Sequence, residues 1–181
     1  PFKTAEAFFR STAHTVFIIL ICTMDNSPLA YHITFGTYGS RLHGDPRGTV
    51  DRRQKSYGQP IVIHSEYRVQ MATDQMKRQP ILLTTDQCVF AQKEIEDICE
   101  RGQWEFIQTA CAPSHVHVLL ASHREPKAIR RWLKRWLGES MSACWALPDG
   151  QSWWAMGGSI KCVWDKEYLQ NVEQYIREQR T

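Results

Sequence analysis

The sequence predicts a single globular domain of mixed α+β class, in which strands and helices follow one another along the chain. The chain has 181 residues, of which 43% are hydrophobic and 11% aromatic, so it can bury a sizeable core and is too apolar to be disordered. Segments that alternate apolar and polar residues, typical of strands, are interspersed with segments whose apolar residues recur at helical spacing. We expect this domain to span residues 28–181.

Residues 1–27 are expected to be an N-terminal extension outside the domain. Their apolar run, Val16–Cys22, is far too short to span a bilayer. Lys3 and Arg10 precede the run, as in a signal peptide, but no small-residue cleavage pattern follows it. Met24 stands just before the first convincing strand, so we interpret the residues before it as an upstream extension or a translation artefact.

Charge and cysteine content limit the possible functions. The chain has 22 Lys and Arg against 19 Asp and Glu, and this net charge of +3 neither requires nor excludes nucleic acid. The six cysteines form no Cys-x-x-Cys pair, which fits reduced, mostly buried thiols in a cytoplasmic protein better than a disulfide framework or a zinc site. They are Cys22, Cys88, Cys99, Cys111, Cys144 and Cys162.

The first predicted strand, Leu29–Thr37, alternates and is rich in β-forming residues. Gly39–Pro60, which follows, combines glycines and prolines with basic residues, the composition of a mobile, positively charged loop. Such a loop either contacts phosphates or is a solvated insertion, and both alternatives stay open. Its basic residues are Arg41, Arg47, Arg52, Arg53 and Lys55.

Residues 61–84 are ambiguous at the sequence level. Ile61–Ile63 has a strand-like composition, and Tyr67–Arg78 fits either a short helix or a strand with a turn. A helix is then expected to run to about Glu100, with Thr85 or Asp86 as its cap. Its apolar stripe consists of Val89, Ile95, Ile98 and Cys99, and Trp104–Thr109 follows as a strand.

A pair of histidines marks the next predicted strand, within Cys111–Ser122. Because side chains alternate along a strand, His115 and His117 share one face while the valines and leucine between and after them share the other. Two imidazoles on one face can hold a single ion, although half-buried or surface histidines are the alternative. The remaining histidines have no comparable pairing and are expected to be structural or on the surface; those considered are His32, His43, His64 and His123.

The clearest helix in the sequence runs from Glu125 to about Trp145. Its apolar residues recur at helical spacing, and they are Ile129, Trp132, Leu133, Trp136 and Leu137. The other face carries a row of cations, Lys127, Arg130, Arg131, Lys134 and Arg135. Such a row holds DNA phosphates, lies on an anionic membrane or is simply solvated. Together with the arginines of the preceding loop, it favours nucleic acid.

The C-terminal part contains a connection, a strand and a helix. Ala146–Gly158 is rich in Gly, Pro and Trp, and its tryptophans either stack on unpaired bases or pack in the core; with the residue before it they are Trp145, Trp153 and Trp154. Ser159–Trp164 is the last predicted strand. Asp165 can cap a final helix that runs to Arg180, with one face formed by Tyr168, Val172, Tyr175, Ile176 and Gln179.

Three motifs give the chain a resemblance to a known family. They are Tyr-His-Ile-Thr-Phe-Gly-Thr at 31–37, His-Val-His-Val-Leu-Leu at 115–120 and Tyr-Leu-Gln-Asn-Val-Glu-Gln-Tyr-Ile-Arg-Glu-Gln at 168–179. Over about residues 28–180 the chain resembles the single-tyrosine HUH transposases of the IS200/IS605 type, and among these the transposases associated with repetitive extragenic palindromes. Members commonly continue after the tyrosine with Asn-Pro, whereas this chain has Arg177-Glu-Gln-Arg-Thr181.

The resemblance implies a ferredoxin-like or RRM-like antiparallel sheet with helices on one face and a C-terminal helix that carries the nucleophile. Carried onto this sequence, it makes Tyr175 the nucleophile and assigns His115, His117 and Gln179 as ligands of Mg²⁺ or Mn²⁺. Residues four apart on a helix lie on one face, so Tyr175 and Gln179 can approach one ion. Tyr168 lies two turns earlier and is expected to be a packing residue.

The implied function is that of a metal-dependent transposase that cleaves and rejoins single-stranded DNA through a 5′-phosphotyrosine intermediate. The implied partners are single-stranded DNA with hairpin or palindromic ends and, in some assemblies, a second copy of the chain. We expect a cytoplasmic, DNA-associated protein that does not bind membranes. Two alternatives remain: a replication-initiation or relaxase-type HUH nickase, and a non-catalytic or domesticated RRM-like nucleic-acid-binding protein. A third interpretation, membrane-surface binding by the basic helix, predicts liposome binding.

Overall fold

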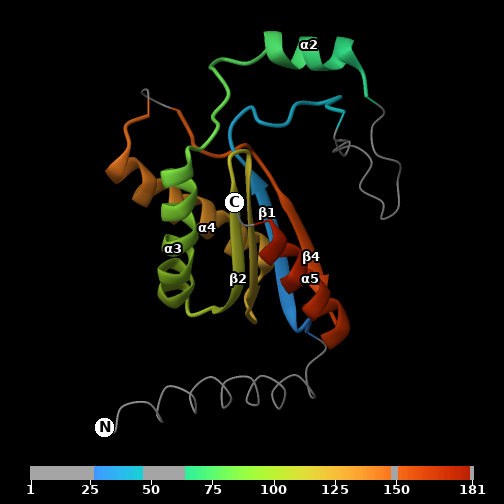
Figure 1. Cartoon of the computed structure of the whole chain (residues 1–181), viewed down its shortest axis with the longest axis vertical. Coiled ribbons are helices and arrows are strands. Elements are labelled where there is room, and N and C mark those ends of the chain that lie inside the picture. The colour runs from blue at the N-terminus through green and yellow to red at the C-terminus, as the bar shows by residue number, and fades with distance from the viewer. Residues whose placement is uncertain (1–26, 47–63, 148–150, 180–181) are drawn as a thin grey trace, which may run out of the picture.

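The fold was obtained as a computed structural model, which describes residues 27–46, 64–147 and 151–179 (Figure 1). Four strands and four helices are placed within these ranges. In chain order they are β1 (Ala30–Gly36), α2 (Glu66–Asp74), α3 (Thr85–Gly102), β2 (Glu105–Ala112), β3 (His115–Ala121), α4 (Pro126–Cys144), β4 (Ser159–Val163) and α5 (Lys166–Glu178).

The strands form one antiparallel sheet in the order β2-β3-β1-β4. Helix α3 connects β1 to β2, and α4 connects β3 to β4, so two β-α-β units interleave in one sheet. This is the ferredoxin-like arrangement, and it confirms the predicted fold class. Only Pro113 and Ser114 join β2 to β3, which makes this pair a tight hairpin.

The two faces of the sheet are covered by different helices. Ile33, Phe35 and Val116 point to the face on which α3 and α4 pack, and this side holds the larger core. Leu119 and Val163 point to the opposite face, where they meet Val172 and Ile176 of α5. The expected division, with connecting helices on one face and the C-terminal helix beside the sheet, is therefore confirmed.

Helix α3 begins one residue earlier than the sequence suggested. Thr84 forms a capping box with Gln87, since the Thr84 hydroxyl accepts from the Gln87 backbone N–H and the Gln87 side chain accepts from the Thr84 N–H. The inclusion of Val89 in the apolar stripe was wrong, because this side chain is 57% exposed. It precedes Ile95 by about one and two-thirds turns, which places it on another side of the helix. The buried stripe consists of Cys88, Ala91, Ile95, Ile98 and Cys99.

Helix α5 begins at its predicted cap, Asp165, and Glu125, where the long basic helix was expected to start, is the N-cap of α4. Glu125 accepts a hydrogen bond from the backbone N–H of Ala128 at 2.8 Å, and Asp165 accepts one from the N–H of Tyr168 at 2.7 Å. The ambiguous segment after position 64 forms a helix, α2, which has no buried residue and lies away from the sheet (Figure 1). The strand-like Ile61–Ile63 falls outside the described residues.

The tryptophans before β4 pack in the core, which favours the packing alternative over stacking on unpaired bases. Trp153 and Trp154 are each 5% exposed. The Trp154 ring packs edge-on against Phe35 with 5.0 Å between ring centres, and the half-buried Trp145 packs in the same way on Phe90. Their aromatic faces are covered because the connection folds back over α4 and β1, which the local composition does not reveal.

The cysteines of the described residues form no disulfide bonds. Cys88, Cys99 and Cys111 are buried, as predicted for most of the cysteines, whereas Cys144 and Cys162 are exposed. Burial raises the pKa of Cys99 to about 12. Buried thiols of this kind are packing groups with little thiolate character.

Candidate functional site

A polar patch lies on the α5 face of the sheet. Strand alternation places His32 and Thr34 of β1 on this face, and the pairing register brings Thr34 beside His117 of β3. In the β1–β4 pairing, His32 lies beside Lys161. The surface further along the same face is lined by Ala30, Leu119 and Val163. Three strands thus contribute polar side chains to one spot.

His32, Thr34 and His117 form a hydrogen-bonded cluster. Nε2 of His32 lies 3.0 Å from Nδ1 of His117, and Oγ1 of Thr34 lies 3.1 Å from the same Nδ1 and 3.3 Å from Nε2 of His32. The two imidazoles are nearly buried, with 6% of His32 and 5% of His117 exposed. Between the two ring nitrogens one atom donates and the other accepts, so the contact needs a single proton.

His115 stands at the edge of this cluster. Its ring is nearly perpendicular to that of His117, with 4.7 Å between ring centres. The hydroxyl of the preceding residue, Ser114, lies 2.9 Å from Nδ1 of His115. In both members of the predicted pair, therefore, Nδ1 is engaged by a neighbouring side chain.

Tyr175 of α5 contacts the histidine cluster from above the sheet. Its ring centre lies 5.6 Å from that of His117, at an interplanar angle of 90°, and 6.3 Å from that of His32. The residue is nevertheless 46% exposed, so one side of the ring meets the imidazoles while the rest is open to solvent. The structure thus brings the predicted nucleophile and the predicted histidine pair together.

Gln179 lies one turn after Tyr175, at the C-cap of α5, and its backbone N–H donates to the carbonyl of Ile176. It is half-buried, and among the described interactions its side chain makes no hydrogen bond to the histidines. Tyr168 is 37% exposed and makes none of the ring contacts of the cluster, so it does not compete with Tyr175 for this position.

The buried imidazoles are neutral at ordinary pH. Burial, with a smaller contribution from the nearby Lys161 ammonium, lowers the pKa of His32 to about 4. Burial also lowers the pKa of His117 to about 3, with additional contributions from His115, His32 and Lys161. A neutral imidazole keeps a lone pair on one ring nitrogen, which a metal ion or a hydrogen-bond donor can use.

Nε2 of His117 is buried and has no hydrogen-bond partner in the structure. Buried polar atoms without partners are uncommon, and a neutral imidazole nitrogen in that position is suited to coordinate a metal ion. Among the residues that the structure describes, no three His, Cys, Asp or Glu side chains are arranged to hold an ion. An ion at His115 and His117 would therefore complete its coordination with other oxygen ligands, such as an amide, water or substrate.

Sequence reasoning missed three members of this patch. His32 was expected to be a structural or surface residue outside the site, whereas it is buried and contacts His117 directly. Thr34 and Lys161 were not assigned to any site. A usable signal was present for His32, since alternation places it and Thr34 on the side opposite Ile33. The pairing register that brings it to His117 is not encoded locally.

The basic residues of α4 do not lie beside the cluster, because α4 packs on the other face of the sheet. Lys134 donates to the carbonyls of Ala155 and Gly157, and Arg130 donates to that of Gly158, so both hold the connection to β4. Arg135 pairs with Glu139 at 2.8 Å.

The remaining predicted DNA contacts lie on exposed surface or outside the described part of the chain. Lys127 and Arg131 are exposed on α4, and Arg41 is exposed in the loop after β1. The other loop arginines, Arg47, Arg52 and Arg53, fall outside the described residues. A DNA-binding role for any of these side chains stays a prediction.

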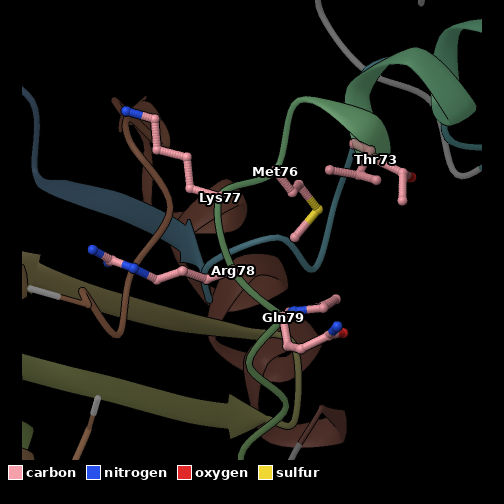
Figure 2. Close-up of a pocket in the computed structure, with 7 residues that line it drawn as sticks. Thr73, Met76, Lys77, Arg78 and Gln79 are labelled. Carbon is pink, nitrogen blue, oxygen red and sulfur yellow. The ribbon is translucent and has the colours of Figure 1, made fainter. Parts of the chain in front are cut away.

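A separate hollow of about 420 Å³ opens between the loop after β1 and the segment joining α2 to α3. Figure 2 shows Lys77 and Arg78 extending to the same side of this segment, with Met76 and Thr73 turned the other way. The lining residues are Leu42, Thr73, Met76, Lys77, Arg78, Gln79 and Pro80. None of the predicted site residues lines this hollow.

Comparisons with known proteins give one structural neighbour to report. No family model matches the sequence, and no curated protein is similar to it. Among solved structures, the chain is similar to a candidate transposase from Deinococcus radiodurans, at 16% sequence identity and a TM-score of 0.46, over 87% of this chain and 95% of that one. The function proposed below depends on the site geometry and the sequence motifs. No helix in the described part of the chain is long and apolar enough to cross a membrane.

Proposed function

We propose that the protein is a metal-dependent, single-tyrosine HUH-type transposase that cleaves and rejoins single-stranded DNA. One observation carries the proposal: the half-exposed ring of Tyr175 lies against the buried imidazole of His117, which comes from a different part of the chain. Packing of the Tyr175 ring alone does not account for the buried Nε2 of His117, which has no hydrogen-bond partner. The arrangement gives a nucleophile that large substrates can reach and a lone pair that can serve a metal ion.

In the proposed reaction the Tyr175 oxygen attacks a phosphorus atom of the DNA backbone. A bond forms between that oxygen and phosphorus, the bond to the departing 3′ oxygen breaks, and the phenolic proton leaves for solvent or a base. The products are a 5′-phosphotyrosine and a free 3′-hydroxyl. Because the phosphodiester energy is kept in the covalent bond, attack by a second 3′-hydroxyl rejoins strands without ATP.

The residues of the patch have separate tasks in this proposal. His115 and His117 would hold Mg²⁺ or Mn²⁺, with Gln179 as a further ligand. When bound, such an ion supplies positive charge beside a phosphate oxygen and helps to orient the phosphorus. Lys161, whose charge is felt at both His32 and His117, adds a fixed positive charge on the same face.

Two neutral imidazoles and an amide would hold a hard cation weakly, so DNA phosphate is expected to complete the coordination and metal to bind best together with substrate. The proposed substrate is single-stranded DNA with hairpin or palindromic ends. Its backbone would meet the exposed cations Arg41, Lys127 and Arg131, while the folded end would be recognised largely by shape. A homodimer fits the proposal as well as a monomer does.

The non-catalytic alternative has less support. An RRM-like module binds single strands on an open sheet face with exposed aromatic rings. Here α5 packs on one face, α3 and α4 pack on the other, and Trp153 and Trp154 are buried. A relaxase-type nickase would use the same cluster, and only the rejoining step distinguishes it from a transposase.

The direct test is the formation of a covalent protein–DNA adduct. The protein is incubated with hairpin-bearing single-stranded DNA and Mn²⁺ and then resolved on a denaturing gel. We expect an adduct with the wild type that is absent from Tyr175→Phe and retained by the matched control Tyr168→Phe. If no such DNA gives an adduct, or if Tyr175→Phe forms it equally well, the nuclease proposal is wrong. Release of a rejoined strand separates the transposase from the nickase.

A further inference from the structure

We infer that His32, assisted by Thr34, is a positioning residue that holds the proton of His117 on Nδ1 and so keeps the lone pair of His117 Nε2 directed into the site. The inference rests on the proposed function only where it assigns that lone pair to metal binding. The proton placement itself is a property of the folded, metal-free protein.

The geometry supplies the contact. Nδ1 of His117 has two possible partners, Nε2 of His32 at 3.0 Å and Oγ1 of Thr34 at 3.1 Å. These two atoms are themselves 3.3 Å apart, so the three form a closed triangle inside the protein. His117 therefore has one ring nitrogen with two partners and another, Nε2, with none.

Only two proton arrangements are compatible with a pair of neutral imidazoles in this contact. If His32 donated through Nε2, His117 would accept at Nδ1 and carry its own N–H at Nε2, buried with no acceptor. If His117 donates through Nδ1, the partnerless Nε2 carries only a lone pair. A buried N–H without a partner is rarer in proteins than an acceptor without one, so the second arrangement is favoured.

The choice of an imidazole as the partner also suits an anionic substrate. Histidines that bind metals usually donate their second N–H to a carboxylate, a carbonyl or a water. A carboxylate next to His117 would repel an approaching phosphodiester, whereas a neutral imidazole accepts the same hydrogen bond without adding negative charge. The charged neighbour that the strand pairing gives His32 is Lys161, which is positive.

The primary test reads the tautomer directly. In ¹⁵N-labelled, metal-free protein, long-range ¹H–¹⁵N spectra report which nitrogen of each imidazole carries the proton. We expect His117 to be protonated at Nδ1 in the wild type, to shift toward the Nε2 form in His32→Phe, and to return to Nδ1 in His32→Gln, whose amide oxygen can accept the bond. Thr34→Val should produce a smaller shift, and the exposed-residue control His123→Gln none. An Nε2-protonated His117 in the wild type, or an unchanged tautomer in a folded His32→Phe, would overturn the inference.

A second measurement tests the purpose of the arrangement. Mn²⁺ binding, followed by electron paramagnetic resonance in the presence of non-cleavable DNA, should weaken about ten- to a hundred-fold in His32→Phe and recover in His32→Gln. If the wild type forms no adduct but the tautomer behaves as expected, the proposed function fails and the positioning role stands. If the adduct forms but the tautomer of His117 is unchanged by substitution of His32, only the positioning role fails. Should His32→Phe not fold, the Gln and Val variants decide the question.

Discussion

The ring of Tyr175 stands perpendicular to that of His117, with 5.6 Å between ring centres, although 58 positions along the chain separate the two residues. The contact forms because α5 returns over the sheet after β4 and is fixed there by Val172 and Ile176. Because Val172 and Ile176 are buried, the helix residues next to them have little freedom of position. Tyr175 is adjacent to Ile176, so its position over the histidines follows from the burial of its neighbour.

Stability should fall as the solution becomes mildly acidic. His32 and His117 have folded-state pKa values lowered to about 4 and about 3, against an ordinary value of 6.5. At a pH between the folded-state pKa and the ordinary pKa of a histidine, the unfolded chain binds a proton that the folded protein does not. Each of the two histidines therefore lowers the unfolding free energy by up to about 1.4 kcal/mol per pH unit as the pH falls. At higher pH both states are neutral and the contribution is constant.

Urea unfolding of the metal-free protein at about pH 7.5 and about pH 5 measures this slope. His32→Phe removes one of the two groups and should reduce the pH dependence, while His123→Gln, at an exposed position, should leave it unchanged. Equal stability of the wild type at both pH values would show that the imidazoles are not held neutral by burial.

Removal of the charge at position 161 should slow the proposed cleavage without unfolding the protein. Lys161 is exposed on β4 and lies beside His32 in the strand pairing. We expect Lys161→Met to reduce the rate of adduct formation about tenfold or more and Lys161→Arg to retain most of it, since a fixed positive charge stabilises the charge developing on the phosphate. Lys166→Met, at the start of α5, is the control. An unchanged rate in Lys161→Met would remove this residue from the site.

Lys134 is expected to act in folding more than in DNA contact. Its ammonium donates to Ala155 and Gly157, and burial, followed by the nearby Arg130, lowers its pKa. Lys134→Met should lower the unfolding free energy by about 1–3 kcal/mol, because two carbonyls lose a charged partner. Arg131→Ala, on the exposed side of the same helix, should change it by less than about 0.5 kcal/mol. Equal effects in urea unfolding would contradict this division.

Trp154 should prove essential for stability. Truncation of this buried ring in Trp154→Ala is expected to cost about 3–5 kcal/mol, as for other large core residues, whereas Trp164→Ala removes a ring that is 57% exposed and should cost far less. Chemical denaturation measures both values. If Trp154→Ala kept its stability and lost affinity for single-stranded DNA, the base-stacking role would be restored.

Local patterns in the sequence predicted most of the elements but fewer of the contacts. The alternation around Val116 was enough to place His115 and His117 on one face, and Asp165 marked the start of the final helix correctly. His32 could not be assigned, because its partner lies 85 positions away and only the strand register joins them. The choice between packing and base stacking for the tryptophans stayed open for a related reason: burial depends on what packs above a side chain, and periodicity does not report it.

The hairpin between β2 and β3 has a consequence for how the protein tolerates insertions. Pro113 and Ser114 alone connect the strands, and the Ser114 carbonyl also accepts from the N–H of Thr37, so β3 begins at a fixed point. Because side chains alternate, a slip of β3 by one residue would turn His117 toward α3 and α4 and expose the neighbouring valines beneath Tyr175. One added residue in this turn would therefore replace the polar patch beneath Tyr175 with an apolar one.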